Sequence, residues 1–465
     1  MANSEPMDAL LGHLRRHGRQ PAGALPDALG ISRATLARAV AAAPGVVRLG
    51  RTRATQYALA RDIRGASRWP LYRLDPQAQV IPLGDLLALD RGEFAFVAAQ
   101  PSDSLLHPPF EHGIFPDLPW FLDDLRPGGF LGRTFAHRMG EHLQLPVDLK
   151  LWDAAHVVTA LLHRGSAQSG DLILGDAELA RALHERDSPS DLVPLADRST
   201  RYPQMALDVL QGEQPGSSPG GEQAKFTATL EHDAGRRAAI VKFSVAEDSA
   251  AARRWADLLR CEALAGRVLD LHGLAAAQAT LVETPGQVFL ESRRFDRSAD
   301  VLGRHGFVSL LAIATTFHGE ASMPWWRLAG LLHADGWLDT ESAQRLCRLY
   351  WFGALIANSD MHLGNAGLLL TDTLPLQLAP AYDMLPMWLR PGSQGQVTIR
   401  DYAVPIPSAG QINAWQWAAT AALDFWEQAQ GLDVTPEVRR FAATMQSGIG
   451  RILERFPRTP ARLPS

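Results

Sequence analysis

The segment that decides the fold is residues 355–365, which read LIANSDMHLGN and place Asp360 five residues before Asn365. A short loop after a helix can present both side chains at once. The carboxylate then faces an acceptor hydroxyl, while the amide oxygen faces a cation that bridges phosphates. The spacing alone is a weak signal, because Asp and Asn in loops more often stabilise turns through local hydrogen bonds. Other parts of the chain must therefore support a chemical role for this pair.

Further elements occur in the order that phosphoryl transfer needs. Residues 381–384 (AYDM) offer Asp383, eighteen residues after Asn365, as a second cation ligand. Upstream, residues 217–225 (SSPGGEQAK) predict a glycine-containing loop whose backbone amides can approach an anion. Lys225 adds a positive charge there, and Lys242 lies in a predicted strand where it could pair with nucleotide phosphates. Taken singly, the loop could be a linker and Lys242 an exposed edge-strand lysine; the ordered combination favours a nucleotide site.

With these motifs the chain resembles the HipA family of toxin–antitoxin serine/threonine kinases, most closely its YjjJ-type members with a fused DNA-binding domain. The motifs cover residues 217–384, and a looser similarity extends over about 60–460. The family loop S-x-x-G-x-Q-x-K matches residues 218–225, and the family hinge matches 293–297 with Arg293 in place of a glutamate. That replacement leaves the adenine contact open, and Glu291 is a candidate substitute.

The resemblance implies a role for each matched residue. Asp360 would be the catalytic proton acceptor, Asn365 and Asp383 would hold Mg²⁺, and Ser218, or Ser217 beside it, would be the autophosphorylation site. No second histidine lies at zinc spacing from His362, so we expect a loop-orienting or nucleotide-contacting role for it. The residues expected to bind ATP are Gly220, Gly221, Glu222, Gln223, Ala224, Lys225, Lys242, Arg293, Arg294, Phe295, His362, Asn365 and Asp383.

The first 60 residues predict a separate unit of three helices (7–17, 24–29 and 32–43) and a hairpin of strands 46–49 and 56–59. Ser32 suits the N-cap of the third helix, and the arrangement resembles a winged helix-turn-helix. Eight arginines oppose three acidic residues here, a local charge of +5 in a chain of net charge −5. We expect duplex-DNA binding through Ser32, Arg33, Thr35, Arg38, Arg51 and Arg53. The alternative is a protein-interaction domain with a solvated arginine face.

The composition of the chain excludes several classes of protein. The 465 residues are 46% hydrophobic and 20% charged, which predicts two to four folded domains. A net charge of −5 excludes a polycation that coats nucleic acid, and two cysteines are too few for a disulfide scaffold or a structural zinc site. The start does not read as a signal peptide, and no apolar stretch approaches the roughly 18–20 residues of a membrane span. We therefore expect a cytoplasmic protein with no membrane contact.

We expect an α+β protein: a winged helix-turn-helix followed by a HipA-like bilobal protein-kinase-like fold with a mostly helical C-lobe. The predicted domains are the winged helix at 1–64, a HipA N-terminal-type subdomain with the start of the N-lobe at 65–211, the N-lobe with the glycine-rich loop at 212–300, and the C-lobe at 301–465. Strands are predicted near 71–74, 94–98, 225–230, 238–243, 287–291 and 374–378. Helices are predicted at 132–143, 153–163 and 250–271.

Three functions fit these features. The first is an ATP-dependent toxin kinase that represses its own promoter and is inactivated by autophosphorylation. The second is a DNA-binding regulator whose kinase-like body only senses a nucleotide or partner, which the changed hinge at Arg293 favours. The third, a small-molecule phosphotransferase, fits the loop less well. The resemblance implies as partners a protein substrate such as an aminoacyl-tRNA synthetase, promoter DNA and a separate antitoxin; winged-helix regulators usually also pair with a second copy.

Overall fold

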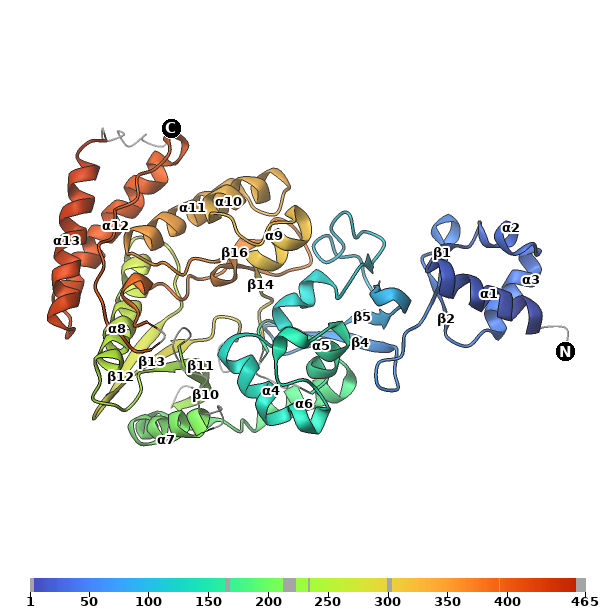
Figure 1. Cartoon of the computed structure of the whole chain (residues 1–465), viewed down its shortest axis with the longest axis horizontal. Helices are drawn as coiled ribbons and strands as arrows, with labels where there is room; N and C mark the ends of the chain where they lie inside the picture. Colours follow the sequence, from blue (N-terminus) through green and yellow to red (C-terminus); the bar gives the residue numbers. More distant parts are fainter. Residues whose placement is uncertain are drawn as a thin grey trace.

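The computed structural model describes residues 4–163, 168–211, 223–232, 235–298, 303–392 and 394–456. Four units follow one another along the chain, and Figure 1 shows the N-terminal unit and the last two helices at opposite ends of the long axis. In the described part of the chain, no helix is both long enough and apolar enough to cross a lipid bilayer.

The N-terminal unit has the predicted three helices and hairpin. The two predicted strands are confirmed at their predicted limits, and a short additional strand pairs with the second to give the order β1-β3-β2. The first helix begins at Ser4, three residues before the predicted start. Ser32 caps the third helix, because its Oγ accepts the Thr35 N–H at 3.1 Å. The elements are α1 (Ser4–His17), β1 (Gln20–Pro21), α2 (Leu25–Leu29), α3 (Arg33–Ala42), β2 (Val46–Leu49) and β3 (Gln56–Leu59).

The middle unit is a five-stranded sheet of order β7-β6-β5-β4-β8 with helices around it. The two strands and two helices predicted here are present, but a nine-residue strand, β5, was not predicted. Its register with β4 shifts at Leu71/Tyr72. The elements are β4 (Arg68–Leu74), β5 (Val80–Ala88), β6 (Phe94–Ala98), β7 (Ile114–Phe115), α4 (Gly129–Leu143), α5 (Ala154–Leu161), β8 (Leu172–Leu174) and α6 (Asp176–Asp187).

The N-terminal unit is docked on the middle unit. One apolar cluster contains Leu49 and Ala58 from the first and Leu87, Leu89 and Ala95 from the second. The connection is itself paired, since the N–H of residue 61 donates to the carbonyl of residue 88 at 2.9 Å. Two polar contacts reinforce the junction.

The first of these contacts is an ion pair between Arg19 and Glu93, at 3.2 Å. In the second, Arg91 donates to the carbonyls of Arg15 and Arg16 at the C-terminal end of α1. A cation is favourable there because the helix ends with unpaired carbonyl oxygens. The two units are therefore held together by packing, by an ion pair and by a helix-end contact.

The sheet lobe comprises residues 192–293 and has the strand order β12-β13-β11-β10-β9. One face packs on α7 through Tyr202, Phe226 and Phe289, and the other packs on α8 through Leu259 and Leu290. The helix predicted at 250–271 has those limits, and Ser249 caps it by accepting the Ala252 N–H. The elements are β9 (Leu192–Pro194), α7 (Arg198–Gln211), β10 (Lys225–His232), β11 (Gly235–Phe243), α8 (Ala250–Leu271), β12 (Ala279–Thr284) and β13 (Gln287–Arg293).

The helical lobe comprises residues 303–456 and contains one small sheet of order β14-β15-β16. The strand predicted at 374–378 forms only over its last two residues, because Pro375 has no N–H for a ladder. A single apolar core runs from Trp120 of the middle unit to Trp337 and Trp426 of this lobe. The elements are β14 (Val308–Ser309), α9 (Leu310–His318), α10 (Trp325–Ala334), α11 (Thr340–Leu355), β15 (Gly367–Leu369), β16 (Gln377–Leu378), α12 (Ile412–Gln430) and α13 (Pro436–Leu453).

Candidate functional site

A cavity of about 390 Å³ lies where the sheet lobe, the helical lobe and the middle unit meet. Its volume is in the roughly 300–1,000 Å³ range of small-molecule sites. The middle unit contributes Ser169 and six residues between positions 124 and 131, which include the start of α4, to the cavity wall. Of the residues predicted to bind ATP, those that line the cavity are Lys225, Lys242, Arg293, Arg294, Phe295 and Asp383.

Lys242 is the centre of the charged end of this cavity. It lies on β11, an interior strand of the sheet, and is only 6% exposed, so the edge-strand alternative is wrong. Its Nζ donates to Glu262 of α8 at 2.5 Å and also to Asp383. A lysine this deeply buried is stable only when carboxylates compensate its charge. The structure therefore joins the strand lysine to the second predicted cation ligand across 141 residues of sequence.

The charges in this trio shift one another. Burial alone would lower the pKa of Lys242, but Asp383 and Glu262 outweigh it and raise the pKa. Burial would raise the pKa of Asp383, yet Lys242 and Lys225 lower it overall. For Glu262, burial outweighs Lys242 and raises the pKa. Near neutral pH the site thus holds a protonated lysine against an ionised Asp383.

Asn358 links the two predicted motifs, although the sequence interpretation did not select it. Its Nδ2 donates to the carbonyl of Asp383 at 3.1 Å, and its Oδ1 accepts the Asp360 N–H at 3.1 Å. Asn365 closes the loop by donating from Nδ2 to the carbonyl of Asp360 at 2.8 Å. Asp383 has a φ of +56°, a strained conformation for a non-glycine residue that these bonds help to hold.

These contacts place the catalytic-loop residues next to the cavity but outside its lining. Asp360 and Asn365 are half-buried, whereas Gly364 between them lines the cavity and receives the Tyr382 hydroxyl hydrogen bond at 2.8 Å. His362 is exposed and accepts the Gly364 N–H at 3.1 Å on Nδ1, so its observed contact is loop-orienting.

The donors present fit a magnesium–nucleotide complex. The Asp383 carboxylate and the Asn365 amide oxygen are hard ligands of the kind Mg²⁺ prefers. Within the described ranges, no group of three or more His, Cys, Asp or Glu side chains could hold a metal by itself. Mg²⁺ held here would therefore need phosphate oxygens as well. Gln223, just before β10, has a buried side-chain nitrogen with no hydrogen-bond partner; such a donor suits an oxygen-rich ligand.

The hinge residues Arg293, Arg294 and Phe295 each make a different kind of contact. The Arg293 side chain lines the cavity and donates to Gln278 at 3.4 Å. The Arg294 guanidinium is committed to Asp296, at 2.7 and 2.9 Å. Phe295 packs against Phe307 and Tyr382, with ring centroids 5.7 Å apart in each pair.

Glu291 lies on the opposite face of the sheet from the cavity. It is 5% exposed and accepts hydrogen bonds from Tyr202 and Arg198 of α7, at 2.8 and 3.1 Å. Glu291 therefore cannot supply the adenine contact in place of the family glutamate that Arg293 replaces.

Part of the predicted glycine-rich loop is not described. Ser217, Ser218, Gly220, Gly221 and Glu222 lie outside the described residues. Ala224 is buried directly before β10, outside the cavity lining.

The residues predicted to contact DNA lie on two elements of the N-terminal unit. Arg33 and Arg38 are exposed on α3, and Arg51 and Arg53 are exposed between β2 and β3. The Ser32 and Thr35 hydroxyls are 3.0 Å apart, because both take part in the cap of α3.

Three residues at the site were not predicted from the sequence. Glu262 pairs with a lysine 20 positions away, and only the general expectation that a helix glutamate accompanies the strand lysine of kinases could have found it. Asn358 had no such signal, because its partners depend on the loop conformation. Asp124 lines the cavity from the middle unit and accepts the Ser309 N–H at 2.6 Å; burial raises its pKa.

Comparisons with known proteins give the family to which the chain belongs. Residues 65–183 match the model of the YjjJ-like toxin middle domain, and residues 217–454 match that of the HipA-like C-terminal domain. The chain is 35% identical to Toxin YjjJ of Escherichia coli (strain K12) over 98% of its own length and 99% of that protein. It also aligns with a chain of the Shewanella oneidensis MR-1 complex of HipA, HipB and operator DNA, with a TM-score of 0.52 and 14% identity, covering 83% of this chain and 97% of that one. The last match concerns the fold alone, but the two family models and the 35% identity over nearly the whole chain lead to one conclusion: the chain belongs to the HipA-like toxin family and, within it, to the YjjJ-like type.

Proposed function

We propose that the protein is an ATP-dependent serine/threonine protein kinase that acts as a HipA-type toxin and is inactivated by autophosphorylation at Ser218 or Ser217. The observation that carries the proposal is the trio of Lys242, Glu262 and Asp383 beside the loop of Asp360. A structural ion pair would not require a proton acceptor and a second oxygen ligand next to it. The family membership supports the same interpretation.

Each residue has a defined task in this proposal. Lys242, fixed by Glu262, neutralises nucleotide phosphates. Asp360 accepts the proton of the substrate hydroxyl and orients it for in-line attack on the terminal phosphate. Asn365 and Asp383 hold Mg²⁺, which when bound offsets the charge that develops on the phosphate oxygens. The Asn358 bonds keep Asp360 and Asp383 at a fixed relative position.

The test is phosphate transfer from radiolabelled ATP by the full-length protein. Wild-type protein should label itself, Asp360→Ala should not, and Asp401→Ala, an exposed aspartate of the same lobe, should label normally. Mass spectrometry then locates the phosphate. Wild-type protein that binds ATP but transfers nothing would refute the kinase and support a nucleotide-sensing regulator, the function that Arg293 in the hinge favours.

We also propose that the N-terminal unit is a winged helix-turn-helix that binds duplex DNA at the protein's own promoter. The exposed arginines on α3 and between β2 and β3 support it, because such side chains suit phosphate contacts. The Shewanella complex contains HipB and operator DNA, so a separate antitoxin is a further proposed partner. A gel-shift titration with the upstream DNA at low salt tests the first point, and the absence of any retardation would refute it.

The proposal also includes a protein substrate, a cytoplasmic location and binding to DNA as a homodimer. A cytoplasmic aminoacyl-tRNA synthetase is the first substrate to test, by transfer of label to purified synthetases in the presence of wild-type protein and of Asp360→Ala. Binding as a homodimer is tested by the mass of the protein–DNA complex in solution.

A further inference from the structure

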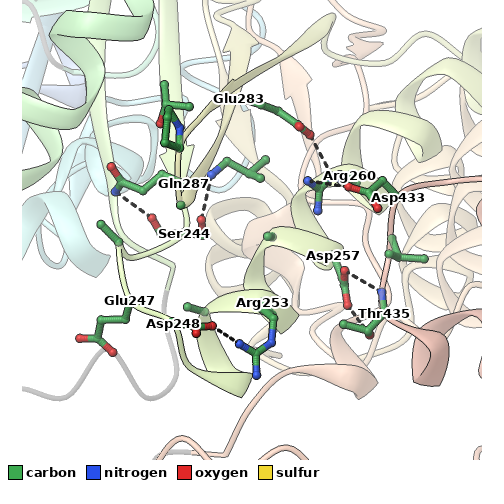
Figure 2. A pocket seen from close by; sticks show the side chains of 18 residues that line it. Ser244, Glu247, Asp248, Arg253, Asp257, Arg260, Glu283, Gln287, Asp433 and Thr435 are labelled. Carbon is green, nitrogen blue, oxygen red and sulfur yellow. Dashed lines mark hydrogen bonds and ion pairs between the residues drawn. The ribbon is translucent and has the colours of Figure 1, made fainter.

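The helix α8 packs into the apolar core of the helical lobe from Leu258 onward, whereas its N-terminal turns border a cavity and make polar contacts with that lobe. The cavity measures about 580 Å³ and lies between the N-terminal half of α8, the β12–β13 turn and the α12–α13 connection (Figure 2). No residue of the candidate functional site lines it. Where a helix borders such a hollow, that side of the helix has few partner atoms for dispersion attraction, so directional bonds contribute more to the position of this part of the helix.

Two buried side chains of α8 make those bonds. The Asp257 carboxylate accepts from the Thr435 N–H at 3.1 Å and from the Thr435 hydroxyl at 2.6 Å, as Figure 2 shows. The Arg254 guanidinium donates to the carbonyl of Leu389 at 3.0 Å. Arg254 and Asp257 are each 2% exposed, so neither bond is exchanged freely for water.

A third residue spans the cavity. Arg260 pairs with Glu283 of the β12–β13 hairpin at 2.9 Å and with Asp433 of the α12–α13 connection at 3.6 Å (Figure 2). Its partners are half-exposed or more, so this pair is the weaker attachment. The buried contacts of Asp257 and Arg254 are therefore the stronger polar attachments of the N-terminal half of α8.

The same helix carries Glu262, which holds Lys242. Asp257 precedes Glu262 by five residues, about 7.5 Å along the helix axis, so a shift of α8 at Asp257 is transmitted to the Lys242 pair. Leu389 follows Asp383 by six residues, so Arg254 ties α8 to the segment that carries the other carboxylate of the trio.

We propose that Asp257 and Arg254 are positioning residues, which set the place of Glu262 and thereby of Lys242 relative to Asp383. The proposal rests on the proposed kinase function and deepens it. A group so placed acts through α8 and needs no contact with substrate or nucleotide. Its loss should lower turnover or ATP use while leaving the fold intact.

Thr435→Val is the informative variant. Thr435 is the N-cap residue of α13, but its side chain makes no capping hydrogen bond, so the substitution removes the hydroxyl bond to Asp257 without removing a cap. Burial already raises the pKa of Asp257 despite the Thr435 bonds, so the carboxylate tolerates the loss of a donor poorly. Thr444→Val, on the same helix and exposed, is the matched control.

The experiment measures kcat/KM for ATP in wild-type protein, Thr435→Val, Glu262→Gln and the double variant. Thr435→Val should lower kcat/KM by about 10- to 100-fold, the scale of a small misplacement of catalytic groups. In the Glu262→Gln background it should add less than about twofold, because its effect passes through Glu262. Thr444→Val should resemble wild type.

Two results would overturn the proposal: no loss in Thr435→Val, or the same loss with and without Glu262. Either would assign Asp257 to stability alone, which thermal melting of each variant measures separately. If wild-type protein transfers no phosphate, the proposed function fails. The Mg–ATP affinity of wild type, Thr435→Val, Glu262→Gln and the double variant is then measured by calorimetry. If the affinity losses of the two single variants do not add up in the double variant, the positioning role is supported. If they add up, or if Thr435→Val loses no affinity, the proposal is overturned.

Discussion

Replacing Asn358 by alanine tests whether the Asp360 and Asp383 loops form one unit. Asn358 is 4% exposed and bonds to both loops at 3.1 Å. Its removal leaves the Asp383 carbonyl and the Asp360 N–H without these partners, and both residues are half-buried. A fully buried unpaired backbone group costs about 1–3 kcal/mol, so we expect Asn358→Ala, which leaves two half-buried ones, to lower the free energy of unfolding by about 2–4 kcal/mol.

The activity should fall more steeply than stability alone explains. With Asp360 and Asp383 no longer held together, phosphate transfer at about 20 °C, where the variant stays folded, should drop about 100-fold, as for a small displacement of catalytic groups. Asn358→Asp separates the two bonds. It keeps the acceptor for the Asp360 N–H but sets a carboxylate against the Asp383 carbonyl, so its transfer rate should fall at least as far.

The measurements are urea unfolding followed by fluorescence and transfer from radiolabelled ATP. Asn413→Ala, at an exposed position of α12, is the control and should match wild type in both. If Asn358→Ala unfolds at the same urea concentration as Asn413→Ala and transfers phosphate at the same rate, the two loops do not depend on Asn358 and the reasoning is refuted.

The remaining predictions concern the proposed proton acceptor, the proposed metal ligand, the proposed DNA contacts and the proposed autophosphorylation site. Asp360→Asn should keep ATP affinity in calorimetry while lowering transfer by about 10²–10⁴-fold, because only the proton acceptor is lost; a near wild-type rate would contradict this. Asp383→Ala should raise the Mg²⁺ concentration needed for half-maximal transfer, zinc should not restore activity, and unchanged turnover would count against the assignment. Arg51→Ala combined with Arg53→Ala should weaken DNA binding by the full-length protein and flatten the plot of log K against log salt by about one unit for each phosphate that the protein no longer neutralises, whereas an unchanged slope would place the DNA-binding surface elsewhere. Ser218→Asp should bind ATP poorly and Ser218→Ala normally, because a phosphate adds about −1.5 to −2 charge beside the triphosphate; phosphate found only at other residues of the wild-type protein would exclude this switch.

Elements with a strong local signal were predictable from the sequence. The helix at 250–271 was predicted to the residue, because a long apolar periodicity begins at a capping serine. The strand β5 was missed because its sequence, VIPLGDLLA, contains Pro82, Gly84 and Asp85, which strands disfavour. The structure explains the glycine: at Gly84 φ is +145°, and an added Cβ would lie 2.2 Å from the Val97 carbonyl oxygen.

Some residues of the candidate site could likewise be predicted from the sequence, and others could not. Lys242, Asp360, Asn365 and Asp383 were predictable because their spacing follows from how phosphates and a cation are held. The contribution of the middle unit, such as Asp124, was not predictable, because 185 residues separate it from its partner Ser309. Interactions of that kind depend on how whole units pack, and a short sequence pattern carries no record of them.

The docking of the N-terminal unit has a consequence for how the molecule moves. Because Arg91 holds the end of α1 and the junction shares an apolar cluster, residues 4–59 should tumble with the rest of the chain as one elongated rotor. A fluorophore on an exposed position of α1 would then report the slow anisotropy decay of a 50.7 kDa particle rather than the fast decay of a tethered small domain. If two chains bind an operator as proposed, such a rotor fixes the azimuth at which each kinase-like body projects from the double helix, so that half-site spacing sets the direction in which the two bodies face.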